Sequence, residues 1–502
     1  MEELLEDFRV YVGRPDVWAR NEDGAGAGAG ERRTPLPAGP GFQEPAKELA
    51  LRIGRALVRA CPPDWAELKA EFALTVDTEY VEVSVFDGGW ATIEPPPAVL
   101  GLVRKQREIS AELDEGPWWR LTLELDDIGE LTVSYDYGQE PFPEGQLFEP
   151  WAYRRDMETY PRPGLPVWLA AYITHGDRQR RTPRQAAVAA RADRRAKRWP
   201  TLSWNDFPDF PQMWARWAVI SAAFVAAESE WGPRIRPGLG WFESSRRAGS
   251  TLYPLPGGRA VLSGGLWEDP RLDAVYNDGA EAPDLYAGAP DWVTDLVLNP
   301  RAATGLLSYC YWWDAGRWYR GESPSAEDLS TTVPGTWTAD TTAGIVAGLL
   351  TGSGQPTEEQ RELASELVSA AQAGVVTRET LVSVFGDEGF DIDGALYQLS
   401  LADLVVTVPT RMHEDDAIAR VRQYVLALGN TSGYSASELV ADRFSIGWRV
   451  YVPVPRGEIS IGRAIFYIAD DGVLVHSSSS VAPSQFIADF EKQFQERQQA
   501  KY

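Results

Sequence analysis

The sequence predicts a multi-domain α+β protein, in which antiparallel sheets pack against helices and a small helical module is added. The chain has 502 residues, more than one hydrophobic core usually serves. Segments that alternate apolar and polar residues occur in two separated regions, and segments with helical spacing of apolar residues flank both. Apolar residues make up 44% of the chain and 20 residues are Trp, so the composition excludes a disordered protein.

Breaks in composition and periodicity divide the chain into five expected parts. They are an α+β domain at 1–176, a basic linker helix at 177–200, a Trp-rich mixed α/β domain of unassigned role at 201–340, a helical module at 341–410 and a C-terminal α+β domain at 411–502. Residues 21–46 are rich in Gly, Ala and Pro and are expected to form a linker or an exposed loop.

The first domain is expected to pack helices on an antiparallel sheet. An amphipathic helix stops at Pro62, three short strands follow over 71–93, and a second helix covers 98–113. Residues 118–137 then form a hairpin around the turn DDIGE, with one core face and one wet face. The core face is assigned Trp119, Leu121, Leu123, Leu125, Leu131, Val133, Tyr135 and Tyr137, and the wet face Trp118, Arg120, Thr122 and Glu124.

Helix signals dominate the part after residue 341. Thr357 begins and Gly374 ends a segment with the pattern of a capped helix, and two shorter helices are expected at 377–386 and 391–405. A helix that reads DNA would need basic residues, whereas the third of these carries Asp391 and Asp393. A DNA-reading role is therefore disfavoured.

The C-terminal domain is predicted to consist of a helix, several strands and a second helix. Asp470 and Asp471 before Gly472 predict a two-residue hairpin turn of type I′ between two strands. In the last helix Phe486, Phe490 and Phe494 repeat every four residues, so one face of this helix is expected to be buried.

The net charge of −25 is unevenly distributed. Residues 178–198 hold nine cations and only Asp193, a net charge of +8, so the rest of the chain carries −33. An acidic body repels nucleic acids and anionic membranes and attracts basic partners, although solubility alone would also favour such a charge. The basic segment fits either an exposed linker helix or a contact surface for an acidic partner or for the protein's own acidic body.

Cysteine usage and the chain start predict a cytoplasmic protein. Cys61 and Cys310 lie far apart, which argues against a disulfide framework and for a reducing compartment. The first ten residues are acidic and lack the apolar region of a signal peptide, and no apolar run reaches the length of a membrane span.

The usual reagents of catalysis are scarce. The three histidines, His175, His413 and His476, fall in three different expected segments, and the sequence holds no zinc, P-loop or serine-hydrolase motif. The carboxylates of GDEGFDIDG (386–394) do not have the spacing of a calcium loop. We therefore expect no metal and no cofactor. An enzymatic role is the alternative: a carbohydrate-active or other hydrolytic enzyme in 201–340 that uses carboxylates such as Glu228, Glu230, Asp269 or Asp314.

The order of elements over residues 46–175, together with DYGQEP (136–141) and DMETYPRPGLPVW (156–168), resembles the YezG-like immunity proteins. This family consists of α+β antitoxins that neutralise toxins of bacterial polymorphic toxin systems. Residues 414–502, with GWRVYVPVP and IFYIADDGVLVHSSSS, look like a second immunity-type domain, similar to the YrhB-like ones found in actinobacteria. The first resemblance points to the motif positions Tyr135, Asp136, Tyr137, Glu140, Asp156, Pro161, Arg162 and Trp168.

The resemblance implies a non-enzymatic immunity protein that binds a cognate, basic toxin. Asp136, Glu140 and Asp156 are the candidate contacts with the toxin, and Tyr137 and Trp168 complete the predicted binding set, although packing of the sheet is an open alternative for these two. Neither nucleic acid nor membrane is expected as a partner. A scaffold protein of a toxin-delivery system is the third possibility.

Overall fold

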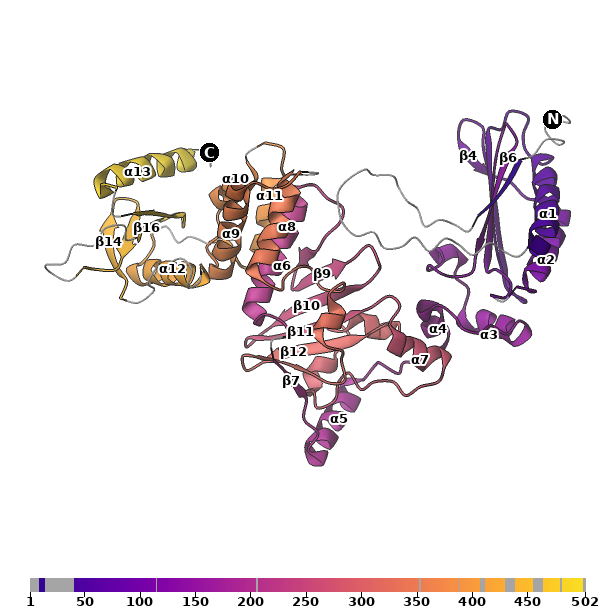
Figure 1. Ribbon diagram of the computed structural model, residues 1–502, viewed down its shortest axis with the longest axis horizontal. Helices are drawn as coiled ribbons and strands as arrows, with labels where there is room; N and C mark the ends of the chain where they lie inside the picture. Colours follow the sequence, from indigo (N-terminus) through magenta and orange to yellow (C-terminus); the bar gives the residue numbers. More distant parts are fainter. Residues whose placement is uncertain are drawn as a thin grey trace. The chain divides into compact units, whose positions relative to one another are not determined.

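The computed structural model describes residues 9–13, 40–113, 115–204, 206–351, 354–386, 388–406, 411–428, 438–454, 464–478 and 481–499. Over these residues the protein has 13 α-helices and three sheets, which confirms the α+β class (Figure 1). The described residues form two compact units. The first contains those of 1–179, 268–282 and 304–306, and the second contains those of 180–267, 283–303 and 307–502. Most of the Gly-rich stretch 21–46 lies outside the described residues.

The first unit is built on a six-stranded sheet with the order β1-β6-β5-β2-β3-β4. Its strands are β1 (Arg9–Gly13), β2 (Glu67–Leu74), β3 (Glu79–Phe86), β4 (Trp90–Thr92), β5 (Arg120–Asp126) and β6 (Glu130–Asp136). The expected meander and hairpin are present, and all their pairings are antiparallel. The sequence pattern did not predict β1, which pairs in parallel with β6 at the edge of the sheet.

Helices α1 (Pro40–Val58) and α2 (Pro97–Ser110) lie on one face of this sheet (Figure 1). The apolar stripe of α1 and the alternate residues of the strands form a single buried core, because both patterns place their apolar side chains on facing surfaces. The prediction that Trp118 lies on the wet face is wrong. Its side chain lies in this core, with none of its surface exposed. The alternation does not extend to Trp118, because β5 begins only at Arg120.

The first unit is completed by α3 (Pro150–Thr159), α4 (Val167–Thr174) and a helix from the middle of the chain, α7 (Pro270–Asn277). Helix α7 packs against α4, and the Asn277 side-chain amide bonds both the N–H and the carbonyl of Leu165. Part of the Trp-rich segment therefore folds with the first unit.

The second unit contains a seven-stranded antiparallel sheet of order β7-β13-β12-β11-β10-β9-β8. Its strands are β7 (Thr201–Ser203), β8 (Arg234–Arg236), β9 (Leu239–Glu243), β10 (Gly249–Leu255), β11 (Arg259–Gly265), β12 (Tyr309–Asp314) and β13 (Arg317–Arg320). Helix α5 (Pro183–Ala196) precedes it, and the helices α6 (Phe210–Ala226), α8 (Ala339–Thr351), α9 (Glu358–Ala373), α10 (Arg378–Phe385) and α11 (Ile392–Leu401) form a bundle beside it.

Helix α6 joins this sheet to the bundle. It is mostly apolar and buried, as expected for a helix in the interior of a large core, and it contacts β8 and β9 as well as α8, α9 and α11. The caps expected for α9 are present, since Thr357 forms a capping box with Gln360 and Gly374 ends the helix at φ +67°. One hydrophobic core thus extends from residue 207 to residue 468.

The C-terminal part of the second unit is a four-stranded antiparallel sheet between two helices. Its elements are α12 (Glu414–Ala427), β14 (Val440–Phe444), β15 (Gly447–Tyr451), β16 (Ala464–Ala469), β17 (Leu474–Ser478) and α13 (Pro483–Gln499). Phe486 and Phe490 of α13 contact Tyr467, so the expected buried face of this helix is confirmed.

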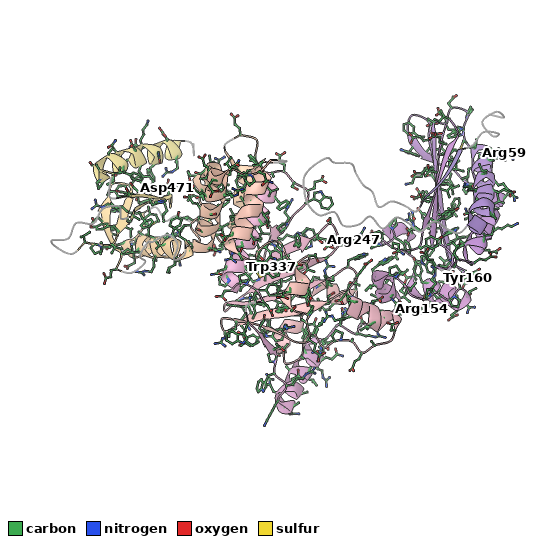
Figure 2. All side chains as sticks on the ribbon, in the orientation of Figure 1. Arg59, Arg154, Tyr160, Arg247, Trp337 and Asp471 are labelled. Atoms are coloured by element: carbon green, nitrogen blue, oxygen red, sulfur yellow. The ribbon has the colours of Figure 1, made fainter. Side chains whose placement is uncertain are left out.

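The loop between β16 and β17 differs from the expected turn. Gly472 has φ +87°, but Asp470 and Asp471 do not have the positive φ that a type I′ turn requires. The amide of Gly472 bonds the carbonyl of Ala469, and the carboxylate of Asp471 (labelled in Figure 2) accepts from Arg497. A three-residue loop with glycine in the left-handed position explains these contacts.

Candidate protein-binding surface

The outer face of the first sheet, opposite α1 and α2, carries polar and aromatic side chains. The pairing register places these residues in rows across the strands, because directly paired residues point to the same face. We call this surface the acidic sheet face and define it by Glu67, Lys69, Glu71, Tyr80, Glu82, Ser84, Phe86, Trp90, Arg120, Thr122, Glu124, Thr132, Ser134 and Asp136.

Two carboxylates stand directly opposite each other on this face. Glu71 of β2 pairs with Glu82 of β3, an arrangement that costs stability between like charges. The neighbours reduce the cost: Lys69 Nζ lies 3.0 Å from Glu71, and the hydroxyl of Tyr80 donates to Glu82. The hydrogen bond to Glu82, followed by burial, raises the pKa of Tyr80 to about 12, so the hydroxyl keeps its proton and its donor role at neutral pH.

One end of the face is fixed by a network around Arg120. Its guanidinium donates to Asp136 (Nη1 to Oδ2, 2.9 Å) and to Gln146 (Nε to Oε1, 2.5 Å). Gln146 in turn donates from Nε2 to Glu71 at 2.8 Å. Asp136 also accepts from the backbone N–H of Gly138 at 2.8 Å. These bonds hold Glu71 in place and occupy both carboxylate oxygens of Asp136.

The edge of the face near β4 is aromatic. Trp90 is 56% exposed, and its ring lies 5.6 Å from that of Phe86, its cross-strand neighbour. Aromatic side chains beside carboxylates suit protein recognition, because they bury a large area at a small entropic cost. Glu71, Glu82 and Trp90 were not among the residues predicted to bind a partner, although their matching positions in the alternation of β2, β3 and β4 would have grouped them.

All five residues predicted to bind a partner belong to the first unit, and three of them are buried in its interior. Tyr137 belongs to its hydrophobic core, and Trp168 is buried and donates from Nε1 to the carbonyl of Gly138 at 2.8 Å. Asp156 has no exposed surface. These three side chains therefore serve packing instead of offering a contact surface. Of the other two, Asp136 lies on the acidic sheet face and Glu140 is half-buried beyond the end of β6.

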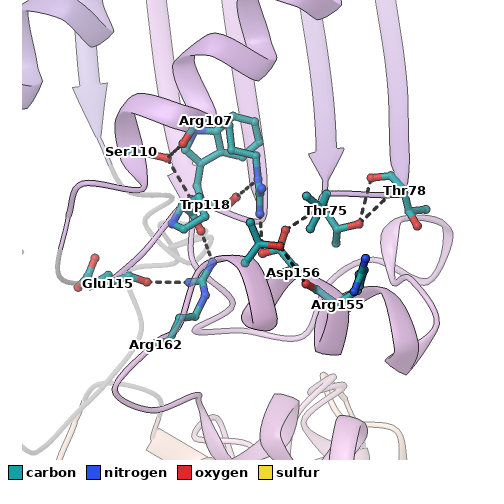
Figure 3. A network of polar contacts seen from close by, with 12 residues as sticks. Thr75, Thr78, Arg107, Ser110, Glu115, Trp118, Arg155, Asp156 and Arg162 are labelled. Atoms are coloured by element: carbon teal, nitrogen blue, oxygen red, sulfur yellow. Dashed lines mark hydrogen bonds and ion pairs between the residues drawn. The ribbon is translucent and has the colours of Figure 1, made fainter.

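The buried carboxylate of Asp156 organises the junction of α2, α3 and the β2–β3 loop (Figure 3). Asp156 accepts from Arg107 Nη2 and from the N–H of Val76, both at 2.9 Å. Arg107 also donates from Nε to the carbonyl of Trp118 at 3.0 Å. Sequence spacing cannot foresee this role, because Arg107 and Asp156 come from different helices.

Arg162, a motif position of the resemblance, lies beside this junction. It donates to the carbonyl oxygens of Glu115 and Pro117, and its guanidinium lies 4.0 Å from the ring centroid of Trp119. Burial lowers the pKa of Arg162 to about 10, so the side chain is still charged at neutral pH. Its role is to connect the loop after α2 with the segment between α3 and α4.

The carboxylates considered for an enzyme lie on different elements of the structure. Glu228 and Glu230 are exposed after α6, Asp314 lies at the end of β12, and Asp269 belongs to the first unit, where it caps α7. Within the described ranges, no group of three or more His, Cys, Asp or Glu side chains is arranged to hold a metal ion. Burial raises the pKa of the Cys61 thiol to about 11 and also raises that of Cys310, so neither is a ready nucleophile at neutral pH.

No protein-family model matches the chain, and no curated protein is detectably similar to it. The resemblance to immunity proteins thus remains a prediction from the motifs given above. In the part of the chain that the structure describes, every helix is too short or too polar to cross a bilayer.

Proposed function

We propose that this protein is an immunity-type inhibitor that binds a basic protein toxin through the acidic sheet face of its first unit. The observation that carries the proposal is the cross-strand pair Glu71–Glu82, two carboxylates held side by side on a face that α1 and α2 leave open. A binding surface gives a reason for an arrangement that is unfavourable for folding alone.

A cationic side chain of the partner would relieve the repulsion between these carboxylates. An Arg or Lys placed between Glu71 and Glu82 gains two charge-assisted hydrogen bonds. Glu124 offers a further acceptor on β5, two residues along that strand from Thr122, the residue that pairs with Glu71. Trp90 supplies an exposed aromatic anchor at the edge. The negative charge of the whole chain, −25, would speed the encounter with a basic protein at low salt.

Hydrogen bonds fix side chains of the acidic sheet face in the absence of a partner. Gln146 donates to Glu71 and is itself held by Arg120, which Asp136 fixes in turn, so less side-chain entropy is lost when a partner binds. Strands also position their side chains more rigidly than loops do.

The test is a binding and protection assay with the full-length chain and the purified toxin encoded beside its gene. We expect the double variant Glu71→Lys/Glu82→Lys to bind about a hundredfold more weakly at low salt, mainly through slower association, because two attractive contacts become repulsive. The matched control is Glu359→Lys/Glu362→Lys on α9, which makes the same charge change on exposed residues of the second unit.

The control should bind within about twofold of the natural chain, since these residues belong to the second unit and are not part of the acidic sheet face. The proposal fails if the natural chain neither binds the toxin nor protects cells from it. It also fails if both double variants weaken binding equally, since net charge alone would then explain the interaction.

A further inference from the structure

Helix α5 presents a row of cations on the outer surface of the second unit. Arg184, Arg191 and Arg195 are seven and four residues apart, so they share one side of the helix, and all three are exposed. Ala186 and Ala190 are buried on the opposite side. Val188 lies within the row and is 52% exposed. The helix has 14 residues and is therefore about 21 Å long.

The row is held in a fixed position. Thr182 forms a capping box with Gln185 at the start of α5. Beyond the two ends of the helix, Arg181 and Arg198 form ion pairs with Asp284 at 2.8 and 3.1 Å. Asp193 accepts from the N–H of Gly288 at 2.9 Å. The basic segment is thus anchored on the second unit through its flanks and through the buried side of α5, while the row lies on the exposed side of the helix.

Among the residues that the structure describes, the cations of the row have no acidic partner of their own. None of the described carboxylates forms an ion pair with Arg184, Arg191, Arg194, Arg195 or Lys197, whereas Arg181 and Arg198 are paired. Like charges three and four residues apart repel each other on a helix, so this sequence weakens α5. An external anion would remove that penalty.

The surroundings of the row favour a short acidic partner over a nucleic acid. The 3-10 turn Asp291–Thr294 packs against α5, and Asp291 and Asp295 are exposed there. Glu322, paired with Arg198, is exposed near the other end. These carboxylates repel any anion that extends beyond the row, and a nucleic acid with its long run of phosphates would experience more of this repulsion than a short acidic segment of a protein.

Exposed tryptophans accompany the cations. Trp199 is 71% exposed just after the helix, and Trp204 is 69% exposed with the Arg317 guanidinium 5.3 Å from its ring centroid. Trp and Arg together are the residues most often found at the energetic centres of protein interfaces.

We propose that the row Arg184–Arg191–Arg195, with Val188 and Trp199, is a docking surface for an acidic segment of a partner protein, either a helix or an extended tail with carboxylates spread over about 20 Å. This surface is opposite in sign to the acidic sheet face and lies in the other unit. The partner proposed for it is acidic, whereas the proposed toxin is basic, so this proposal does not rest on the proposed function.

The test uses the full-length chain and a fluorescein-labelled 20-residue peptide of glutamate with leucine at every fourth position. Fluorescence anisotropy at low salt should show saturable binding that weakens as salt is added. The triple variant Arg184→Glu/Arg191→Glu/Arg195→Glu should bind the peptide at least about tenfold more weakly. Trp199→Ala, which leaves the charge unchanged, should also weaken binding.

The matched control is Arg59→Glu/Lys105→Glu/Arg246→Glu, the same charge change at exposed positions elsewhere (Arg59 is labelled in Figure 2). It should bind the peptide as the natural chain does. Circular dichroism checks that both triple variants keep their helix content. The proposal is overturned if the peptide does not bind, if both triple variants lose binding equally, or if a 20-nucleotide single strand or duplex of DNA binds more tightly than the peptide.

Discussion

At the scale of single residues, the first unit depends on a charge pair that water does not reach. The side chains of Arg107 and Asp156 are 7% and 0% exposed, and the Asp156 carboxylate accepts hydrogen bonds from Arg107 and from the N–H of Val76. A buried pair of this kind adds little net stability compared with apolar residues. The loss of one partner, however, leaves the other charge buried without a counter-charge. Asp156 is thus important for folding although it is not a contact residue.

We expect Asp156→Ala to destabilise the first unit by about 3–5 kcal/mol, because the Arg107 charge would remain buried without its carboxylate. Calorimetry of the full chain should show a lower Tm for one transition. Asp77→Ala, at a surface pair 3.5 Å from Arg155, is the control, and it should cost less than about 1 kcal/mol. Equal shifts for the two variants would contradict this assignment.

At the scale of elements, α13 is attached to the C-terminal sheet through its phenylalanines. Phe490 is 2% exposed and contacts Phe444 and Tyr467, whereas Phe494 is only half-buried. The four-residue repeat in the sequence is sufficient to predict which face of α13 is buried, because the helical period is a local property. The repeat does not show which strand the face meets.

Phe490→Ala should destabilise the attachment of α13 by about 3–5 kcal/mol, since it opens a cavity in a tightly packed cluster. Phe494→Ala should cost clearly less. Hydrogen exchange of the β16 amides measures the difference, with faster exchange expected for Phe490→Ala. If the two variants exchange at the same rate, the packing of Phe490 does not decide the stability of this layer.

At the scale of the whole molecule, each compact unit contains one thiol, half-buried in the first unit and buried in the second. Cys61 lies in the first unit and its Sγ donates to the carbonyl of Leu57 at 3.4 Å, and Cys310 lies in the core of the second. Since the pKa of Cys61 in the folded chain, about 11, is above its ordinary value of 9.0, the thiol form contributes stability that is complete below pH 9 and declines as the pH rises toward 11.

The two thiols can therefore report the opening of each unit separately. At pH 8, Cys61 in the Cys310→Ser variant should react with a disulfide reagent about a hundredfold more slowly than in denaturant, because of its raised pKa. Cys310 in the Cys61→Ser variant should react more slowly still, because it has no exposed surface. A Cys310 that reacts as fast as Cys61 would show that the second unit opens readily.

Only part of the acidic sheet face can be predicted from the sequence. Alternation identifies Arg120, Thr122 and Glu124 as one wet face of a hairpin, and the structure agrees. It does not reveal that Glu71 meets Glu82, because their distance depends on the register of β2 with β3. Similarly, the sequence gives no reason to distinguish Asp136 from Asp156, because both are carboxylates in adjacent motifs. In the structure Asp136 lies on the acidic sheet face, whereas Asp156 is buried.

The sequence by itself determined the properties that are local in the chain: the α+β class, the caps of α9, the buried stripe of α13 and the concentration of positive charge around α5. The tertiary structure alone decided which distant segments share a core, such as α6 with the bundle and α7 with the first unit, and which charged side chains remain in contact with water. The physical reason is that periodicity and capping act over a few residues, whereas burial of a charge depends on partners brought together from far along the chain.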